Sequence, residues 1–354
     1  MGFSVIKPRR HLQSPPPCVN LQRCGLWVID FWWLSIDKPT CHSLTIKEYC
    51  FGYELIIIDE AQNIPQVGKG LKIMVDQVPG IGVIATGSFS FDLSNKIGEP
   101  LVGRQRVLKL FPISVIELLG RMNKIELANQ LDQLLVYGAY PEVLTIGALQ
   151  EKERYLADMV NAYLLKDILA LEGIRPPRVL LDLLRLLAYQ VGSEVSLNEL
   201  SRNLNIDVKT VGRYLDLLEK SFIVFSLGGF SRNLRSEVIS KKKYYFYDTG
   251  IRNAIINSFN PMPVRGDKGQ LWENWIIMER LKKKTYHSIF SNDFFWRTYS
   301  QQEIDWIEER EGKIFAYEFK WKEQPVKIPK VWAQHYPGVP IDLITAKNFF
   351  PFVS

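Results

Sequence analysis

The fold is decided by the stretch LIIIDE, residues 55–60, an apolar run that ends in two carboxylates. A short run of branched apolar residues is typical of a parallel strand that is buried on both faces of its sheet. Ligand sites in such sheets lie just beyond the carboxyl ends of the strands. The sequence therefore predicts an α/β domain with a site at Asp59 and Glu60.

The acidic pair has two interpretations. In the first, Asp59 holds Mg²⁺, a hard cation that prefers carboxylate and phosphate oxygens, and Glu60 orients or deprotonates an attacking water. In the second, the two carboxylates form a solvated end to a buried strand. The six residues alone do not distinguish between them.

A second apolar run with small polar residues at its end, VIATGS, spans residues 83–88. The separation of about 25 residues from the first run suits a helical crossover between parallel strands. Thr86 or Ser88 would then place a hydroxyl near the γ-phosphate of a nucleotide. Further on, Arg104 is a candidate arginine finger, although a lone arginine is more often a surface charge.

Several motifs occur in the order found in a large prokaryotic family, which this chain resembles from about residue 50 to 325. The family consists of AAA-type P-loop ATPases with a C-terminal domain of unknown function. The resemblance implies ATP and Mg²⁺ as cofactors and a P-loop NTPase sheet. The motifs that carry it are YELIIIDEAQNIP (53–65), ATGS (85–88), PLVGR (100–104), YGAYPEV (137–143) and YLLKDI (163–168).

One part of the family pattern is missing, namely the phosphate-binding loop G-x-x-x-x-G-K-[ST] that should precede Asp59. The backbone N–H groups and lysine of that loop hold the phosphates. The GKG at residues 68–70 follows the strand and lacks the spacing, so it is no substitute. We therefore expect impaired ATP binding and an incomplete P-loop sheet. A truncated or frameshifted reading frame is favoured over an evolved pseudo-ATPase.

Residues 1–45 differ from the rest of the chain and are expected to be atypical and poorly ordered. They contain a run of three prolines and three tryptophans. All four cysteines of the chain, Cys18, Cys24, Cys41 and Cys50, lie in the first fifty residues. Their spacing fits no paired zinc pattern, so no metal site is predicted there.

Residues 146–239 are predicted to be helical and winged-helix-like. Ser196 with Glu199 forms a capping-box pattern, Asp207 caps a second helix over 208–221, and a strand begins at residue 223. The second helix of such a module can enter the DNA major groove. The alternative is a module used only for packing or protein contacts. The DNA-contact candidates are Arg202, Lys209, Arg213, Arg232 and Arg235.

Residues 240–354 carry the pattern of PD-(D/E)XK nucleases: Asp305, then Glu318-x-Lys320 on a neighbouring strand. In this chemistry two carboxylates hold a divalent cation that activates water, and the lysine stabilises charge on the phosphate. Glu273, on a preceding helix, would complete the set of metal ligands. The alternative is an ion-pair cluster on a folded scaffold.

The bulk composition agrees with a folded protein, with 47% hydrophobic and 23% charged residues and a net charge of +6. No apolar run is long enough for a membrane span, so a cytoplasmic protein is expected. Residues 46–145 are predicted to be the AAA-type core. The chain is interpreted as an ATPase-like protein with a DNA-binding and nuclease-like C-terminal region. A Mg²⁺-dependent nuclease, a non-catalytic DNA-binding scaffold and a homo-oligomer stay open.

Overall fold

The structure is a computed structural model that falls into two units, Met1–Leu110 and Phe111–Ser354, which are described separately. Ser88, Arg104, Arg232 and Arg235 lie outside the described residues, so their predicted roles stay predictions. The structure describes residues 26–29, 50, 52–61, 64, 67–87, 106–164, 177–230, 242–298 and 300–354.

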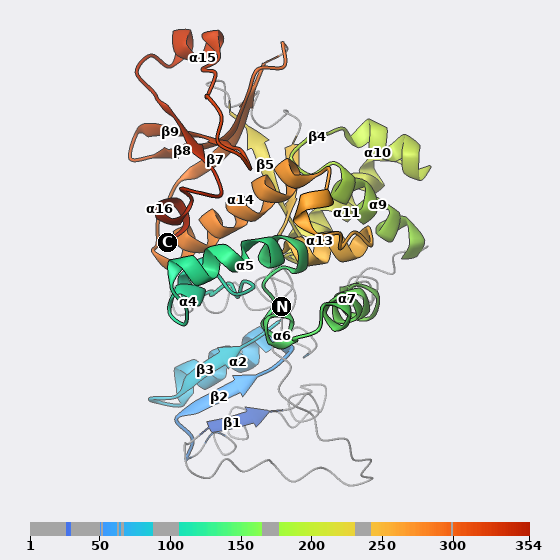
Figure 1. Cartoon of the computed structure of the whole chain (residues 1–354). Helices are drawn as coiled ribbons and strands as arrows, with labels where there is room; N and C mark the ends of the chain where they lie inside the picture. The colour runs from blue at the N-terminus through green and yellow to red at the C-terminus, as the bar shows by residue number, and fades with distance from the viewer. Residues whose placement is uncertain are drawn as a thin grey trace. The chain divides into compact units, whose positions relative to one another are not determined.

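The first unit contains a parallel sheet in the order β1–β2–β3. Its strands are β1 (Leu26–Ile29), β2 (Leu55–Ile58) and β3 (Gly82–Ala85), and α2 (Val67–Gln77) connects the last two (Figure 1). Ile56 and Ile58 are fully buried against α2, as the apolar run predicts. The parallel strand and its helical crossover are therefore confirmed. β1, within the segment expected to be atypical, was not predicted.

The second unit begins with helices that pack against a later helix, α13 (Thr249–Ile255). The side chain of Thr249 donates to the carbonyl of Leu134, and that of Asn253 to the carbonyl of Val136. The carbonyl of Val136 lies in the last turn of α5, where helix carbonyls lack a partner within the helix, whereas the carbonyl of Leu134 also accepts from the N–H of the C-cap residue Gly138. The earlier helices are α4 (Val115–Leu119), α5 (Lys124–Tyr137), α6 (Pro141–Thr145), α7 (Leu149–Asp158) and the π-helix η3 (Met159–Leu164).

The motif at residues 137–143 packs against Asp248, the N-cap residue of α13. Asp248 is buried and accepts hydrogen bonds from the backbone N–H groups of Ala139, at 2.8 Å, and Ile251, at 3.1 Å. Gly138 has φ 74° and ψ −165°, a conformation that essentially only glycine adopts. Asp248 therefore joins two segments that are far apart in the sequence.

A seven-stranded sheet organises the rest of this unit, in the order β10–β9–β8–β7–β5–β6–β4. β5 pairs with β6 in antiparallel fashion and, through Gly228 and Gly229, with β7 in parallel. Strands from the predicted middle and C-terminal regions thus share one sheet, which the sequence analysis did not predict. The strands are β4 (Glu194–Val195), β5 (Val224–Gly229), β6 (Lys242–Phe246), β7 (Asn292–Arg297), β8 (Glu303–Arg310), β9 (Lys313–Phe319) and β10 (Ile341–Ile344).

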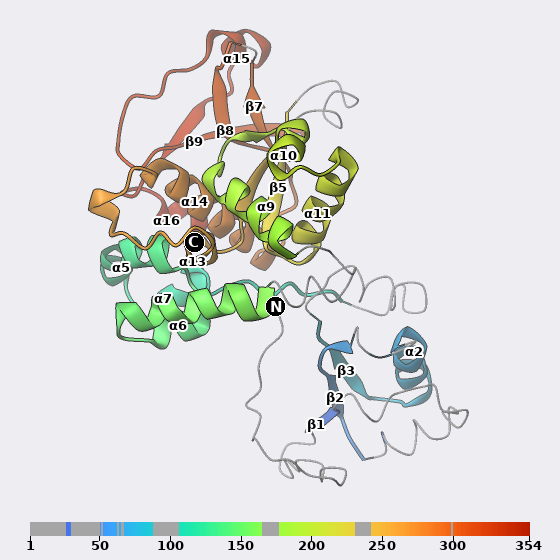
Figure 2. The same cartoon turned by 90° about the vertical axis from the view of Figure 1, so that its right-hand side faces the viewer.

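Three helices lie together beside β5, as Figure 2 shows, and two of them begin at the cap residues that the sequence predicts. Ser196 accepts from the N–H of Glu199 and begins α10, and Asp207 accepts from the N–H of Thr210 and begins α11. Asn205 ends α10 in the left-handed conformation. The helices are α9 (Pro177–Tyr189), α10 (Leu197–Leu204) and α11 (Val208–Lys220).

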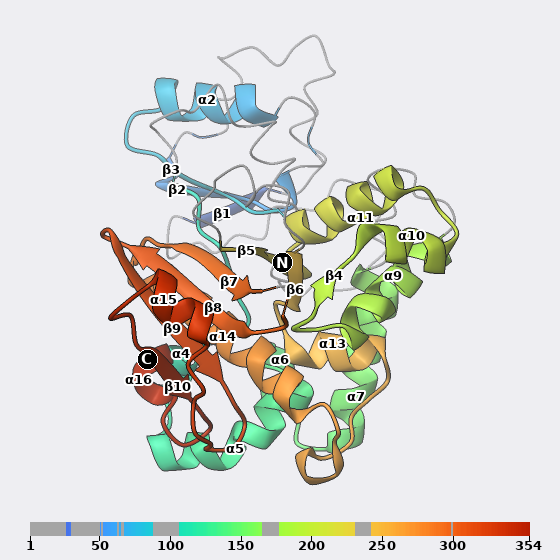
Figure 3. The same ribbon diagram turned by 90° about the horizontal axis from the view of Figure 1, so that it is seen from above.

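A long helix, α14 (Lys268–Tyr286), crosses one face of the sheet and packs on β6 and β9 (Figure 3). Arg280 of α14 forms a two-pronged ion pair with the buried Glu308 of β8, with Nε–Oε1 and Nη2–Oε2 distances of 2.6 and 2.8 Å. Among the helices that the structure describes, none has the length and apolar character needed to cross a membrane. The remaining elements are η4 (Met262–Val264), α15 (Lys330–His335) and α16 (Phe350–Val353).

Candidate active site

The structure brings together the three residues of the predicted nuclease-like pattern at the ends of β8 and β9. The Nζ atom of Lys320 lies 2.6 Å from Oε1 of Glu318 and 3.7 Å from Oδ2 of Asp305. Asp305 also accepts from the backbone N–H of Phe319 at 2.8 Å, which fixes its carboxylate against β9. The alternation of side chains along a strand places Glu318 and Lys320 on the same side of β9.

Glu273 of α14 joins the cluster through residues that the sequence analysis missed. Its Oε1 accepts from the hydroxyl of Tyr245 at 2.7 Å and lies 3.5 Å from the ammonium of Lys243. Lys243 is fully buried and also pairs with Glu303. The strand LysLysTyrTyrPhe of β6 thus supplies a cation and a hydroxyl to a cluster whose acids lie on β8, β9 and α14.

The alternation of side chains between the two faces of a strand was the one sequence signal for these missed residues. Lys243 and Tyr245 are two residues apart on β6, and Glu303 and Asp305 are two apart on β8, so each pair shares one side of its strand. No sequence signal pairs Lys243 with Glu303, because β6 and β8 are separated in the sheet by β5 and β7.

Burial and mutual repulsion make the carboxyls of this cluster weak acids. Burial and the nearby Asp305 raise the pKa of Glu318 to about 7. Burial also raises the pKa of Glu273 to about 7, although Lys243 acts in the opposite sense. The pKa of Asp305 is raised as well, chiefly by burial. For Lys243 burial lowers the pKa, but the carboxylates of Glu273 and Glu303 outweigh it and the net shift is upward.

These shifts predict that stability falls as the pH rises from about 4 to about 7. The folded protein holds protons on Glu273 and Glu318 up to a pKa of about 7, whereas the unfolded chain releases them near about 4.3. Between these values the folded state binds more protons, so the free energy of unfolding should decrease by ~1–3 kcal/mol through this window. Urea unfolding at a series of pH values measures the slope.

Glu318→Gln should flatten this slope, because the amide does not titrate. Glu309→Gln, a half-buried position on β8 outside the cluster, serves as the control and should keep the slope of the original protein. Parallel pH profiles for the original chain and Glu318→Gln would contradict the assignment of the slope to this cluster.

The donor atoms of the cluster fit a hard divalent cation. Asp305 and Glu318 present carboxylate oxygens on either side of the Lys320 ammonium, which marks a point that a cation can occupy. Among the described residues no three acidic, histidine or cysteine side chains are arranged to hold a metal ion. Mg²⁺, however, commonly uses only one or two carboxylates together with substrate phosphates and water. Two carboxylates are therefore sufficient for this class of site.

In the first unit, the residues predicted around the apolar run also meet. Thr86, just after β3, donates from Oγ1 to Oδ1 of Asp59 at 2.5 Å, and its hydroxyl accepts from the N–H of Glu60 at 3.3 Å. Glu60 adopts a positive φ of 50°. The carboxyl ends of β2 and β3 thus place a carboxylate and a hydroxyl side by side, as the parallel register requires.

The described DNA-contact candidates lie on α10 and α11. Arg202, Lys209 and Arg213 are exposed, while the apolar stripe of α11 is buried. The guanidinium of Arg202 donates from Nε to the carbonyl of Asn198, and that of Arg213 lies over the ring of Tyr214. Whether these side chains meet DNA stays a prediction.

Comparison with known protein families agrees with this arrangement. Residues 31–119 match the family described as AAA domain, residues 128–261 a domain of unknown function (DUF8612), and residues 268–329 a second domain of unknown function (DUF4143). The first match covers β2, α2 and β3, and the last covers α14 and the strands of the carboxylate cluster. The first match supports an AAA-type ATPase-like domain over residues 31–119.

Similar proteins come from distant prokaryotes and are themselves uncharacterised. One from Mycobacterium tuberculosis is 26% identical over 275 residues, which is 77% of this chain and 59% of the relative. One from Methanocaldococcus jannaschii is 24% identical over 268 residues, or 71% of this chain and 58% of the relative. The chain thus spans about three fifths of the length of these relatives.

Proposed function

We propose that this AAA-type ATPase-like chain carries a Mg²⁺-dependent, nuclease-like site in its second unit and that its substrate is DNA. The observation that carries the proposal is the meeting of Asp305, Glu318 and Lys320 at the ends of β8 and β9. Two acids and a lysine at one point are the groups that hydrolysis of a phosphodiester requires.

Each side chain has a role that follows from its surroundings. Asp305 and Glu318 would hold the divalent cation, which when bound polarises a phosphate oxygen and lowers the pKa of a water. Lys320 is half-buried at the strand end, and its ammonium would donate to a non-bridging phosphate oxygen. Glu273, held by Tyr245 and Lys243, would add a third carboxyl group beside Asp305 and Glu318.

DNA is the favoured substrate because of the helices beside this sheet. The order α9, β4, α10, α11, β5, β6, with β6 between β4 and β5, supports the winged-helix interpretation. In the helix pair α10 and α11, the second helix exposes Lys209 and Arg213 to solvent, and the first exposes Arg202. Such cations bind phosphates without reading sequence, so binding should weaken as salt increases.

Nucleotide binding by the first unit rests on fewer groups. Thr86 and Asp59 form the pair expected beside a Mg²⁺–nucleotide. The sequence has no G-x-x-x-x-G-K-[ST] loop, which supplies most phosphate contacts in this class. DNA cleavage by the second unit should therefore not depend on ATP.

The test is cleavage of supercoiled plasmid and of branched DNA by the purified chain with Mg²⁺, with and without ATP. Glu318→Gln should reduce the rate at least ~100-fold, because it removes a carboxylate that positions the cation and its water. Glu309→Gln on the same strand pair should cleave as fast as the original chain. ATP should leave all three rates unchanged.

The controls separate the competing explanations. Equal cleavage by the original chain and Glu318→Gln would identify a contaminating nuclease and refute the proposed site. DNA binding that falls steeply with salt, without cleavage in Mg²⁺ or Mn²⁺, would instead identify a non-catalytic DNA-binding scaffold.

A further inference from the structure

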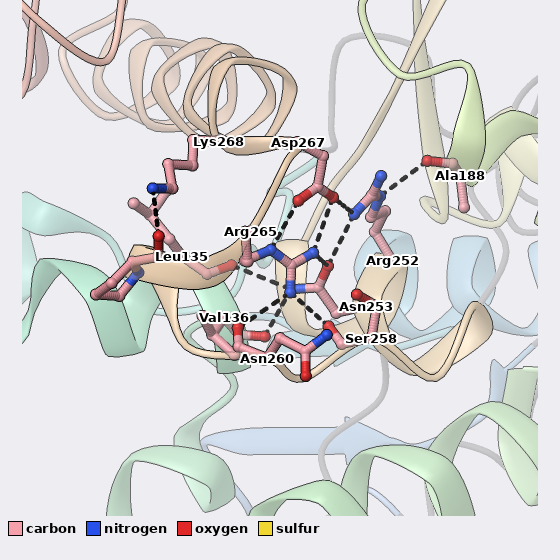
Figure 4. Close-up of polar contacts among 11 residues, drawn as sticks. Leu135, Val136, Ala188, Arg252, Asn253, Ser258, Asn260, Arg265, Asp267 and Lys268 are labelled. Carbon is pink, nitrogen blue, oxygen red and sulfur yellow. Dashed lines mark hydrogen bonds and ion pairs between the residues drawn. The ribbon is translucent and has the colours of Figure 1, made fainter.

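Away from the carboxylate cluster, two buried arginines share a single carboxylate at the start of α14 (Figure 4). Nη1 of Arg252 lies 2.5 Å from Oδ2 of Asp267, and Arg265 binds both oxygens of Asp267, each at 2.8 Å. Arg252 and Arg265 are 4% and 6% exposed. Two guanidiniums against one carboxylate leave an excess positive charge, which is costly to bury without a further anion.

The hydrogen bonds of the two arginines show which one carries the unused donors. A guanidinium has five N–H groups. Arg265 donates hydrogen bonds from all five N–H groups, and the acceptors are Asp267, Asn253 and the carbonyls of Ser258 and Asn260. Arg252 donates from Nε to the carbonyl of Ala188 and from Nη1 to Asn253 and Asp267. Among the described residues, its Nη2 has no hydrogen-bond partner.

Arg252 is one of the residues that line a cavity of about 530 Å³. A cavity of this size is in the range that holds small organic ligands. The lining is polar, with one aromatic ring at the edge, since the side chain of Tyr189 is largely exposed. The residues around the cavity are Tyr189, Arg252, Ile256, Asn257, Ser258, Gly266, Asp267 and Gln270.

Residues at the N-terminus of α14, a helix of 19 residues, also line this cavity. Asp267 is the N-cap residue, but its side chain makes no capping bond, because both oxygens are held by the arginines. Gly266 and Gly269 border open space. Uncapped N–H groups and the helix dipole favour an anion at this point.

We propose that this cavity binds the phosphate group of a small phosphorylated compound, held by Nη2 of Arg252 and by the first N–H groups of α14. An arginine fork combined with a helix N-terminus is the arrangement that suits a phosphate. The bound phosphate neutralises the excess charge of the arginine pair. This site is separate from the carboxylate cluster, and it does not depend on DNA cleavage.

The test is a calorimetric titration of the full chain with inorganic phosphate, using acetate as the carboxylate probe. All proteins carry Lys320→Gln, so that the ammonium of the candidate active site does not bind the probe. Gln270→Glu places a negative charge in the first turn of α14, where it suits the helix dipole and preserves folding. Gln150→Glu, in the first turn of α7, is the matched control.

Phosphate should bind saturably to the background protein and to Gln150→Glu with equal affinity. Gln270→Glu should bind at least ten-fold more weakly, because its carboxylate repels the anion. Equal affinity in Gln270→Glu, or no saturable binding up to about 10 mM phosphate, would overturn the proposal. Tighter binding of acetate than of phosphate would overturn the choice of phosphate as the ligand group.

Discussion

Gly138→Ala should lower the free energy of unfolding of the second unit by ~3–5 kcal/mol. A methyl group at this position would lie 2.0 Å from Oδ1 of the buried Asp248, so the carboxylate must move away from its backbone donors. The backbone adds a second penalty, since φ 74° with ψ −165° is a conformation that alanine avoids. Such a loss is a large fraction of the stability of a typical domain.

Urea unfolding followed by tryptophan fluorescence measures this effect. Gly212→Ala is the matched control, because Gly212 lies within α11 and a methyl group there meets no atom within 4 Å. That substitution should leave stability unchanged or raise it by about 0.5–1 kcal/mol, since alanine is the better helix former. Equal unfolding midpoints for the two variants would refute the role assigned to the contact between Gly138 and Asp248.

Arg280→Met should destabilise the second unit by ~3–5 kcal/mol, because it leaves the fully buried carboxylate of Glu308 without its main counter-charge. Burial alone would raise the pKa of Glu308, but the paired guanidinium of Arg280 reverses this effect and holds that pKa below its usual value. The variant also removes the bond from Nη1 of Arg280 to the carbonyl of Phe352, at 2.8 Å.

The double variant Arg280→Met with Glu308→Leu tests the cause. Replacing both charges by apolar groups removes the uncompensated carboxylate, so the loss should shrink to ~1–2 kcal/mol. Unfolding midpoints of the single and double variants in urea give the comparison. A double variant as unstable as Arg280→Met would mean that packing of the arginine stem, rather than the buried charge, dominates.

The parts of the fold and site that the sequence predicted are those that depend on a pattern among residues close together in the chain. The run at residues 55–58 is apolar at every position, which is typical of a parallel strand, and it is β2, with Ile56 and Ile58 buried and the two alternate positions half-buried. Glu318 and Lys320 lie two residues apart, which puts them on one side of a strand wherever that strand goes. The side chains of Ser196 and Asp207 each accept from the backbone N–H three residues later. A segment of four residues is therefore enough to predict each helix cap.

What the sequence did not predict depends on contacts between distant segments. Lys243 on β6 pairs with Glu303 on β8, three places away in the sheet, and with Glu273 on α14, and no periodicity in the sequence indicates either contact. Asp248 has the same sequence signature as Asp59, an acid at the end of an apolar strand. It nevertheless serves as a buried acceptor for Ala139 and Ile251, because the segment at residues 137–143 packs against it.

The position of β5 between β6 and β7 limits which fragments of this protein can fold by themselves. A fragment starting at β6 would contain every acid of the candidate active site, yet it would expose the backbone N–H and carbonyl groups of β6 and β7 that β5 covers. Unpaired strand edges of this kind recruit other chains and promote aggregation. Biochemical work on the carboxylate cluster therefore requires β5 on the same polypeptide.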